Sequence, residues 1–296
     1  MFYDRIQRLD NIVSHLDVKY NFPMLKGVEI GDLYHKLSGD ILNYVTQTNY
    51  ITNHIFAPPD IDDTKKFKNI TPNGLVLPKK ENYLEYNIIH RTIAEILTSL
   101  NLLQSTKKIH NPINLRLVDG RPNLKIDSRP RASVKLHTDI WAGEFTDTIM
   151  IFIPVLGSMK SVPVEFFEPP DSIYPRYLKP LPKYDDGAFF EAQSTKYNVQ
   201  LENGYLYIID GFLLHKTIKT GHGSRLSIDF RFLPKESVET DKIIESPRNE
   251  NYLETQDWIR IGKDRLTISS DSLHTEYDLD KTHDGYANEY KIILCE

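Results

Sequence analysis

Two histidines and one aspartate have the residue types and spacing of a metal site. His137 and Asp139 flank Thr138. Residues two apart on a strand point to one face, roughly 6 to 7 Å apart, so an imidazole and a carboxylate can meet at a common point. His215 follows the apolar run 212–214 and is placed to add a second imidazole from a neighbouring strand. Two imidazoles and one carboxylate that leave coordination positions open favour iron(II). We therefore expect His137, Asp139 and His215 to hold Fe(II).

A second His-x-Asp pattern, formed by His15 and Asp17, weakens the motif taken alone. Ten histidines in a chain rich in aspartate are enough to produce such a pair by chance. His15 lies where no barrel strand is expected, whereas His137 ends the apolar run 132–136 and precedes the run 148–155. We therefore assign the first pair to ordinary surface chemistry. For His137 the alternative is a buried histidine at the mouth of a barrel, without a ligand role.

A carboxylate anchor is indicated ten residues after His215, where Arg225 opens a strand with clean alternation. Arg225 and Ser227 share a face and can grip a carboxylate together, the guanidinium through its bidentate fork and the hydroxyl as an added donor. The alternative is that Arg225 merely pairs with Asp229. The apolar face consists of Leu226, Ile228, Phe230 and Phe232, and the polar face of Arg225, Ser227, Asp229 and Arg231.

A different register casts His222 as the distal ligand and Arg231 as the anchor. His222 lies in Thr-Gly-His-Gly, a turn signal, whereas His215 ends an apolar run. Six residues of strand span roughly 20 Å, so Arg225 and Arg231 cannot hold the same carboxylate. We therefore prefer His215 with Arg225.

The assembled pattern resembles the Fe(II)/2-oxoglutarate-dependent dioxygenases, which carry His-x-Asp, a distal His and then Arg-x-Ser or Arg-x-Thr. His137, Asp139, His215, Arg225 and Ser227 match it position by position, within about residues 112–234. The resemblance implies Fe(II), 2-oxoglutarate as cosubstrate and O2 as oxidant. It also implies that 2-oxoglutarate is decarboxylated to succinate while a substrate C–H bond is oxidised. Halogenating members lack the carboxylate ligand, so Asp139 favours hydroxylation, alcohol oxidation or epimerisation.

The segment 137–144 and the strand at 225–232 resemble more narrowly a subgroup from bacterial surface-carbohydrate and streptomycin-type aminoglycoside gene clusters. This resemblance implies a small polar substrate, most plausibly a carbohydrate or a nucleotide-linked sugar. Trp141 and Glu144 follow the metal pair, where an aromatic face could stack on a sugar and a carboxylate could bind hydroxyls. Trp141 is equally well explained as a buried rim residue.

A basic and aromatic cluster in the segment 169–186 gives further substrate-binding candidates: Tyr174, Arg176 and Tyr177. These side chains could hold the phosphates of a nucleotide-linked sugar. The alternative is a solvated loop with scattered charges. The segment is too long for a tight turn, which makes it a candidate lid.

The elements that must position these residues are short β-branched and aromatic runs, divided by turn residues, from 111 to 234. They predict a mainly β fold with flanking helices, whose core is a jelly-roll or cupin-like double-stranded β-helix. Residues 1–110 are expected to form a helical and loop region that packs on this core, and 235–296 a C-terminal extension. Helices are expected at 32–47 and 81–103. Strands are expected at 113–118, 132–137, 148–155, 162–167, 197–201, 205–210, 213–218, 225–233, 258–261 and 290–294.

Composition and hydropathy limit the kinds of binding partner and the cellular compartment that we expect. A formal net charge of −5 argues against nucleic acid. Cys295 is the only cysteine, which excludes an intrachain disulfide and a thiolate metal cluster. The sequence shows neither a secretory signal nor an apolar run of about eighteen residues, so we expect a cytoplasmic protein without membrane contact.

Two rival functions stay open. The chain could be a 2-oxoglutarate hydroxylase of a protein side chain, an amino acid or another metabolite. It could also be a non-enzymatic metal-binding scaffold or sensor with a cupin-like fold. Arg225 and Ser227 argue against the second rival, because metal storage needs no carboxylate anchor.

Overall fold

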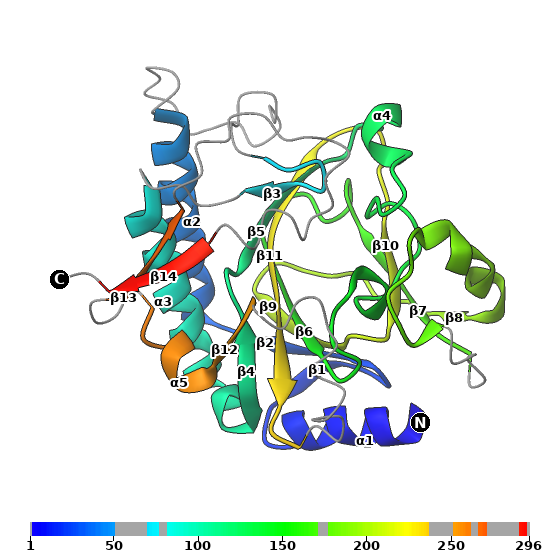
Figure 1. Cartoon of the computed structure of the whole chain (residues 1–296), viewed down its shortest axis with the longest axis horizontal. Coiled ribbons are helices and arrows are strands. Elements are labelled where there is room, and N and C mark those ends of the chain that lie inside the picture. Colours follow the sequence, from blue (N-terminus) through cyan, green and yellow to red (C-terminus); the bar gives the residue numbers. More distant parts are fainter. Residues whose placement is uncertain are drawn as a thin grey trace.

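Antiparallel sheets dominate the computed structural model, which describes residues 2–50, 70–76, 82–170, 177–236, 251–261, 266–270 and 290–294 (Figure 1). The large sheet has nine strands, and its main path runs β1-β2-β9-β6-β11-β4-β12, with β5 also paired to β11 and β3 to β5. A three-stranded sheet has the order β10-β7-β8, and β13 pairs with β14. The strands are β1 (Val18–Phe22), β2 (Leu25–Glu29), β3 (Leu75–Val76), β4 (Thr106–His110), β5 (Asn114–Asp119), β6 (Ile149–Gly157), β7 (Val164–Glu168), β8 (Thr195–Lys196), β9 (Tyr205–Asp210), β10 (Leu214–Thr217), β11 (Ser224–Pro234), β12 (Tyr252–Glu254), β13 (Leu266–Ser270) and β14 (Tyr290–Leu294).

Successive core strands alternate between the two larger sheets. The chain runs from β6 in the large sheet to β7 and β8 in the small one, returns to β9, crosses to β10 and returns to β11. Antiparallel strands that cross between two sheets in this way form a double-stranded β-helix, or jelly roll. The predicted fold class, mainly β with flanking helices around such a core, is confirmed.

Helices α2 and α3 cover the outer side of the large sheet, and the small sheet lies on its other side (Figure 1). Ile41 of α2 and Ile93 of α3 belong to one buried cluster with Ile153 of β6 and Phe230 of β11. A second cluster lies between the two sheets and includes Phe152 of β6. The helices are α1 (Phe2–Val13), α2 (Asp32–Tyr50), α3 (Tyr83–Ser99), α4 (Leu124–Asp127) and α5 (Thr255–Trp258), with short 3-10 turns η3 (Leu102–Ser105), η4 (Ile140–Ala142) and η6 (Tyr184–Gln193).

Alternation along β11 follows the sequence prediction. Its four apolar side chains join the cluster under the helices. Arg225, Ser227, Asp229 and Arg231 are also buried. Since successive side chains of a strand point to opposite faces, these four polar groups point toward the interior between the sheets.

Several predicted elements are wrong or incomplete. Residues 132–136 form turns rather than a strand, and only a single bridge marks His137. Residues 197–201 and 258–261 are not strands either. The region 1–110 holds strands as well as helices: β1 and β2 extend the large sheet beside β9, and β4 pairs with β11.

The two predicted helices are confirmed as α2 and α3. In α3 the residues Ile89, Ile93 and Ile96 are buried at helical spacing, whereas Leu84 and Ile88 of the same apolar pattern are exposed. No helix among the described residues is long and apolar enough to cross a membrane.

Candidate active site

The backbones of His137 and His215 are joined directly. His137 N donates to His215 O at 3.0 Å, and His215 N donates to His137 O at 2.8 Å. This bridge brings the loop before η4 against β10 and places the two imidazole centroids 4.3 Å apart. The two predicted imidazole ligands therefore lie side by side, although 78 residues separate them in the sequence.

Each imidazole is oriented by a carbonyl two residues earlier in the chain. His137 Nδ1 lies 2.7 Å from Lys135 O, and His215 Nδ1 lies 3.0 Å from Leu213 O. A carbonyl only accepts, so Nδ1 carries the proton in both rings and Nε2 keeps its lone pair. Metal-binding histidines are oriented in this manner by backbone carbonyls.

Burial keeps both rings neutral. It lowers the pKa of His137 to about 3, with a contribution from neighbouring His215, and it also lowers the pKa of His215. At neutral pH each ring is therefore an uncharged imidazole, the form that binds metal ions.

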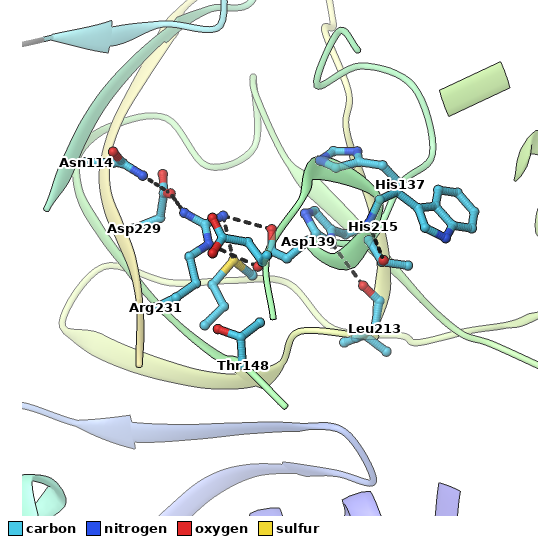
Figure 2. Close-up of polar contacts among 12 residues, drawn as sticks. Asn114, His137, Asp139, Thr148, Leu213, His215, Asp229 and Arg231 are labelled. Atoms are coloured by element: carbon cyan, nitrogen blue, oxygen red, sulfur yellow. Dashed lines mark hydrogen bonds and ion pairs between the residues drawn. The ribbon is translucent and has the colours of Figure 1, made fainter. Parts of the chain in front are cut away.

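Asp139 is buried and held by a bidentate ion pair. Arg231 Nη2 lies 2.8 Å from Oδ1, and Arg231 Nε donates to Oδ2 at 3.1 Å (Figure 2). Burial alone would raise the pKa of Asp139, but the charge and hydrogen bonds of Arg231, together with the two neighbouring histidines, outweigh burial and lower the pKa below its ordinary value. Asp139 is therefore an ionised carboxylate.

The donor set fits a divalent metal ion in chemistry, because it offers two neutral imidazoles with free Nε2 atoms and one carboxylate. Within the described ranges, however, no three His, Cys, Asp or Glu side chains form a group that could hold a metal ion as they stand. Both oxygens of Asp139 accept hydrogen bonds from Arg231. Coordination by all three side chains requires Asp139 to share an oxygen between Arg231 and the metal.

A second carboxylate, Asp229, fixes Arg231 from the other side. Asp229 pairs with Arg231 Nη1 at 2.5 Å, and it accepts a hydrogen bond from Asn114 Nδ2 at 3.0 Å (Figure 2). Asp229 also pairs with Arg116 Nε at 2.7 Å. Arg231 is therefore occupied by two carboxylates, and His222 is exposed. Both facts disfavour the register in which His222 and Arg231 bind metal and cosubstrate.

Arg225 presents the opposite situation: it is a buried cation without an ionic partner among the described residues. Its side chain lies over the Phe152 ring at 5.5 Å, and its Nη1 donates to Val162 O at 2.6 Å. Its Nε and the Oγ atoms of Ser224 and Ser227 are buried with no hydrogen-bond partner in the described part of the chain.

The surroundings of Arg225 favour an added anion. Burial and, to a lesser extent, the charge of Arg116 lower the pKa of Arg225 to about 9, although the charge of Asp229 opposes them. Asp229 forms no ion pair with Arg225, because its oxygens contact Arg116, Arg231 and Asn114. A buried guanidinium without a counterion is costly, and a bound carboxylate removes that cost.

The predicted substrate-binding residues are mostly enclosed. Trp141 is fully buried, and its Nε1 donates to Tyr177 O at 2.9 Å. Of the two interpretations of Trp141 that the sequence allowed, the buried rim residue is therefore the one observed, and the ring offers no exposed face to a sugar. Tyr177 is also buried, and Tyr174 and Arg176 lie outside the described residues.

Glu144 is buried as well. It accepts a hydrogen bond from Tyr252 Oη at 2.7 Å. Burial, followed by the charge of Glu144, raises the pKa of Tyr252 well above its ordinary value. Glu144 therefore belongs to the packed wall behind the metal residues.

Tyr184 was not among the predicted site residues, and Arg231 was considered only as a carboxylate anchor in the alternative register, not as the partner of Asp139. The Tyr184 ring stacks on His137, with centroids 4.5 Å apart and planes 6° apart. Tyr184 was visible only as an aromatic residue near the end of the candidate lid. Arg231 could have been found, because it shares the polar face of its strand with Arg225.

The described end of the candidate lid contacts the metal-site loop through main-chain groups. Leu181 N donates to Trp141 O at 3.1 Å, and Arg131 donates to Leu181 O at 3.0 and 2.7 Å. Residues 171–176 of this segment lie outside the described residues. Closure of 169–186 over substrate stays a prediction.

Replacing Gly187 with alanine is expected to detach this segment. A Cβ at Gly187 would lie 2.1 Å from Trp141 Cη2, and the indole is fully buried and has little room to move. Overpacking of this kind costs about 1 to 3 kcal/mol, so tryptic cleavage after Lys183 should become roughly tenfold faster or more. Gly39→Ala is the control, because a Cβ there meets nothing within 4 Å. Equal cleavage rates in both variants would contradict the expectation.

The chain matches no family model and no curated protein sequence. Solved structures with a similar chain course include the non-haem α-ketoglutarate-dependent epimerase SnoN from nogalamycin biosynthesis, with 14% identity, 78% of this chain and 83% of that chain covered and a TM-score of 0.39. AviO1 from Streptomyces viridochromogenes Tue57 has 12% identity over 80% of this chain and 96% of that one, with a TM-score of 0.39. An N-substituted L-amino acid dioxygenase from Burkholderia ambifaria AMMD has 12% identity over 77% and 90%, with a TM-score of 0.37. At these identities and TM-scores the similarities do not identify a family or a substrate for this chain.

Proposed function

We propose that this chain is an Fe(II)- and 2-oxoglutarate-dependent dioxygenase that acts in the cytoplasm and oxidises a C–H bond of a small polar substrate. The observation that carries the proposal is the buried guanidinium of Arg225, which has no ion-pair partner among the described residues and lies in the same interior as His137, His215 and Asp139. A metal-binding scaffold or sensor does not require such a group. A reaction that consumes a dicarboxylate requires a buried cation to bind the carboxylate.

His137, His215 and Asp139 would hold the iron. The carbonyls of Lys135 and Leu213 fix the imidazoles so that Nε2 is the ligand atom in both rings. When bound, Fe(II) supplies the activation of O2 and of the α-keto acid that this chemistry requires.

Arg225 and Ser227 would bind the far carboxylate of 2-oxoglutarate. The hydrogen bond from Arg225 Nη1 to Val162 O fixes the guanidinium, while Nε and the Ser227 hydroxyl remain available as donors. An ion pair to a bound carboxylate stabilises the charged form of Arg225, which burial alone disfavours. Arg225 and Ser227 would therefore select an anion of fixed orientation.

The walls of the site exclude water from the reacting region. Tyr184 covers one face of the His137 ring, and Trp141 closes the loop behind Asp139. Buried surroundings of this kind limit competing hydrolysis and strengthen the electrostatic contacts to the cosubstrate.

For the substrate we infer a carbohydrate or a nucleotide-linked sugar of surface polysaccharide or aminoglycoside biosynthesis, with hydroxylation, alcohol oxidation or epimerisation as the outcome. Support comes from the resemblance of 137–144 and 225–232 to that subgroup and from the presence of Asp139. Trp141 and Tyr177 act in this proposal by packing the site wall, since both are buried. An amino acid, a protein side chain or another metabolite is the second candidate substrate class.

The test is succinate release from 2-oxoglutarate by the full chain, reconstituted with Fe(II) and ascorbate. Slow release is expected without substrate, and faster release with a member of the correct class in a panel of nucleotide-sugars, free sugars and amino acids. Isotope incorporation from 18O2 into the product identifies a hydroxylation. Absence of both 2-oxoglutarate binding and succinate release in the metal-loaded protein would overturn the proposal.

A further inference from the structure

Asp139 is the one proposed ligand whose donor atoms are already engaged by another side chain. Arg231 contacts Oδ1 through Nη2 and Oδ2 through Nε, at 2.8 and 3.1 Å. A carboxylate has about four lone-pair sites, two on each oxygen. A guanidinium that donates to both oxygens side by side uses one lone pair of each oxygen, namely the two that point to the open side shared by both oxygens. The remaining sites point away from one another, so one metal ion cannot reach both oxygens.

From this geometry we propose that Arg231 is a positioning residue that restricts Asp139 to binding the metal through a single oxygen. The inference rests on the proposed metal site and assigns a role that the reaction class alone does not require. A monodentate carboxylate leaves one more coordination position than a chelating one. That position is then available to a bidentate cosubstrate and to O2.

The fork of Arg231 is itself held in place. Nη1 pairs with Asp229, and Nη2 also lies 3.7 Å from Met150 Sδ on the neighbouring strand β6. Asp229 is fixed in turn by Arg116 and Asn114. The guanidinium therefore cannot rotate away from Asp139 without breaking a second buried ion pair.

Charge reinforces this arrangement. Arg231 forms ion pairs with two buried carboxylates, Asp139 and Asp229, and a guanidinium stays protonated in proteins. Arg231 stays a cation, so its contact with Asp139 persists when the carboxylate also binds a metal ion. A lysine at this position would keep the charge but lose the two-pronged contact.

The experiment records the infrared difference spectrum of the full-length protein on binding Zn(II), without 2-oxoglutarate or substrate. The separation between the antisymmetric and symmetric carboxylate stretches is larger than that of a free carboxylate for one-oxygen binding, and smaller for chelation. We expect the larger separation in the unmodified protein. We expect the smaller separation in Arg231→Lys, because the second oxygen of Asp139 is then free to chelate.

Arg225→Lys is the matched control, since it makes the same replacement on the same face of β11 without touching Asp139, and it should leave the separation at the unmodified value. Arg231→Gln provides a second variant if Arg231→Lys does not fold, as judged by circular dichroism, and should also show the smaller separation. A small separation in the unmodified protein, or an unchanged one in both Arg231 variants, overturns the positioning role while leaving the metal site intact. Failure of the unmodified protein to bind Zn(II), Co(II) or Mn(II) overturns the proposed metal site itself.

Discussion

Arg225→Ala is expected to raise the 2-oxoglutarate concentration for half-maximal succinate release by about thirtyfold or more. Removing one partner of a buried, hydrogen-bonded charge pair costs about 2 to 5 kcal/mol, and 2 kcal/mol corresponds to about a thirtyfold change in affinity. Arg225 has no ion pair with any described residue, so the variant breaks the hydrogen bond to Val162 O and the contact with the Phe152 ring but no ion pair within the described part of the chain. The measurement is the initial rate of succinate formation against 2-oxoglutarate concentration.

Two further variants make this result specific. Arg225→Lys should recover part of the loss, because lysine keeps the charge but cannot form the bidentate fork. Arg231→Ala should change the dependence on 2-oxoglutarate far less, since Arg231 already pairs with Asp139 and Asp229. A large shift for Arg231→Ala with none for Arg225→Ala would instead support His222 as the distal ligand.

Asp139→Ala is expected to abolish turnover, because it removes the only carboxylate among the proposed metal ligands. It also leaves Arg231 with Asp229 as its remaining buried ion-pair partner, and breaking a buried pair costs about 3 to 5 kcal/mol. Asp139→Asn is therefore the better variant, since the amide oxygen can still accept a hydrogen bond from Arg231. The measurement is succinate release with Fe(II), together with urea unfolding to confirm that the variant is folded. Full activity of either variant without added halide would refute the assignment of His137, Asp139 and His215 as the ligands.

The sequence predicted best where one local pattern determines the structure. The alternation in β11 identified both faces of that strand, and the helix expected at 81–103 is α3. The prediction that His137 and His215 lie close together rested on the spacing of the motif, and it did not need the strand that was expected at 132–137. That stretch forms turns, and its contact with β10 is a single bridge.

Long-range contacts account for what the sequence missed. The hairpin of β1 and β2 was hidden because its strands are five residues each and their pairing with β9 lies far along the chain. Arg231 was recognised as facing inward, but its partner Asp139 comes from a different part of the fold. Whether Trp141 is buried or exposed depended on residues 177–187, which pack against it.

The position of β11 also determines the order in which the chain can fold. Among the described strands, those that pair with β11 are β4, β5 and β6, and all three precede it in the sequence. During synthesis these three strands must wait with unpaired edges until residues 224–234 leave the ribosome, and such long-range pairing is slow and exposes the chain to aggregation. Four polar side chains enter the interior in this late step. Arg231 can then pair with Asp139, and Arg225 is enclosed without a counterion. We therefore expect 2-oxoglutarate, present during refolding, to raise the yield of folded protein by binding only after β11 has been inserted.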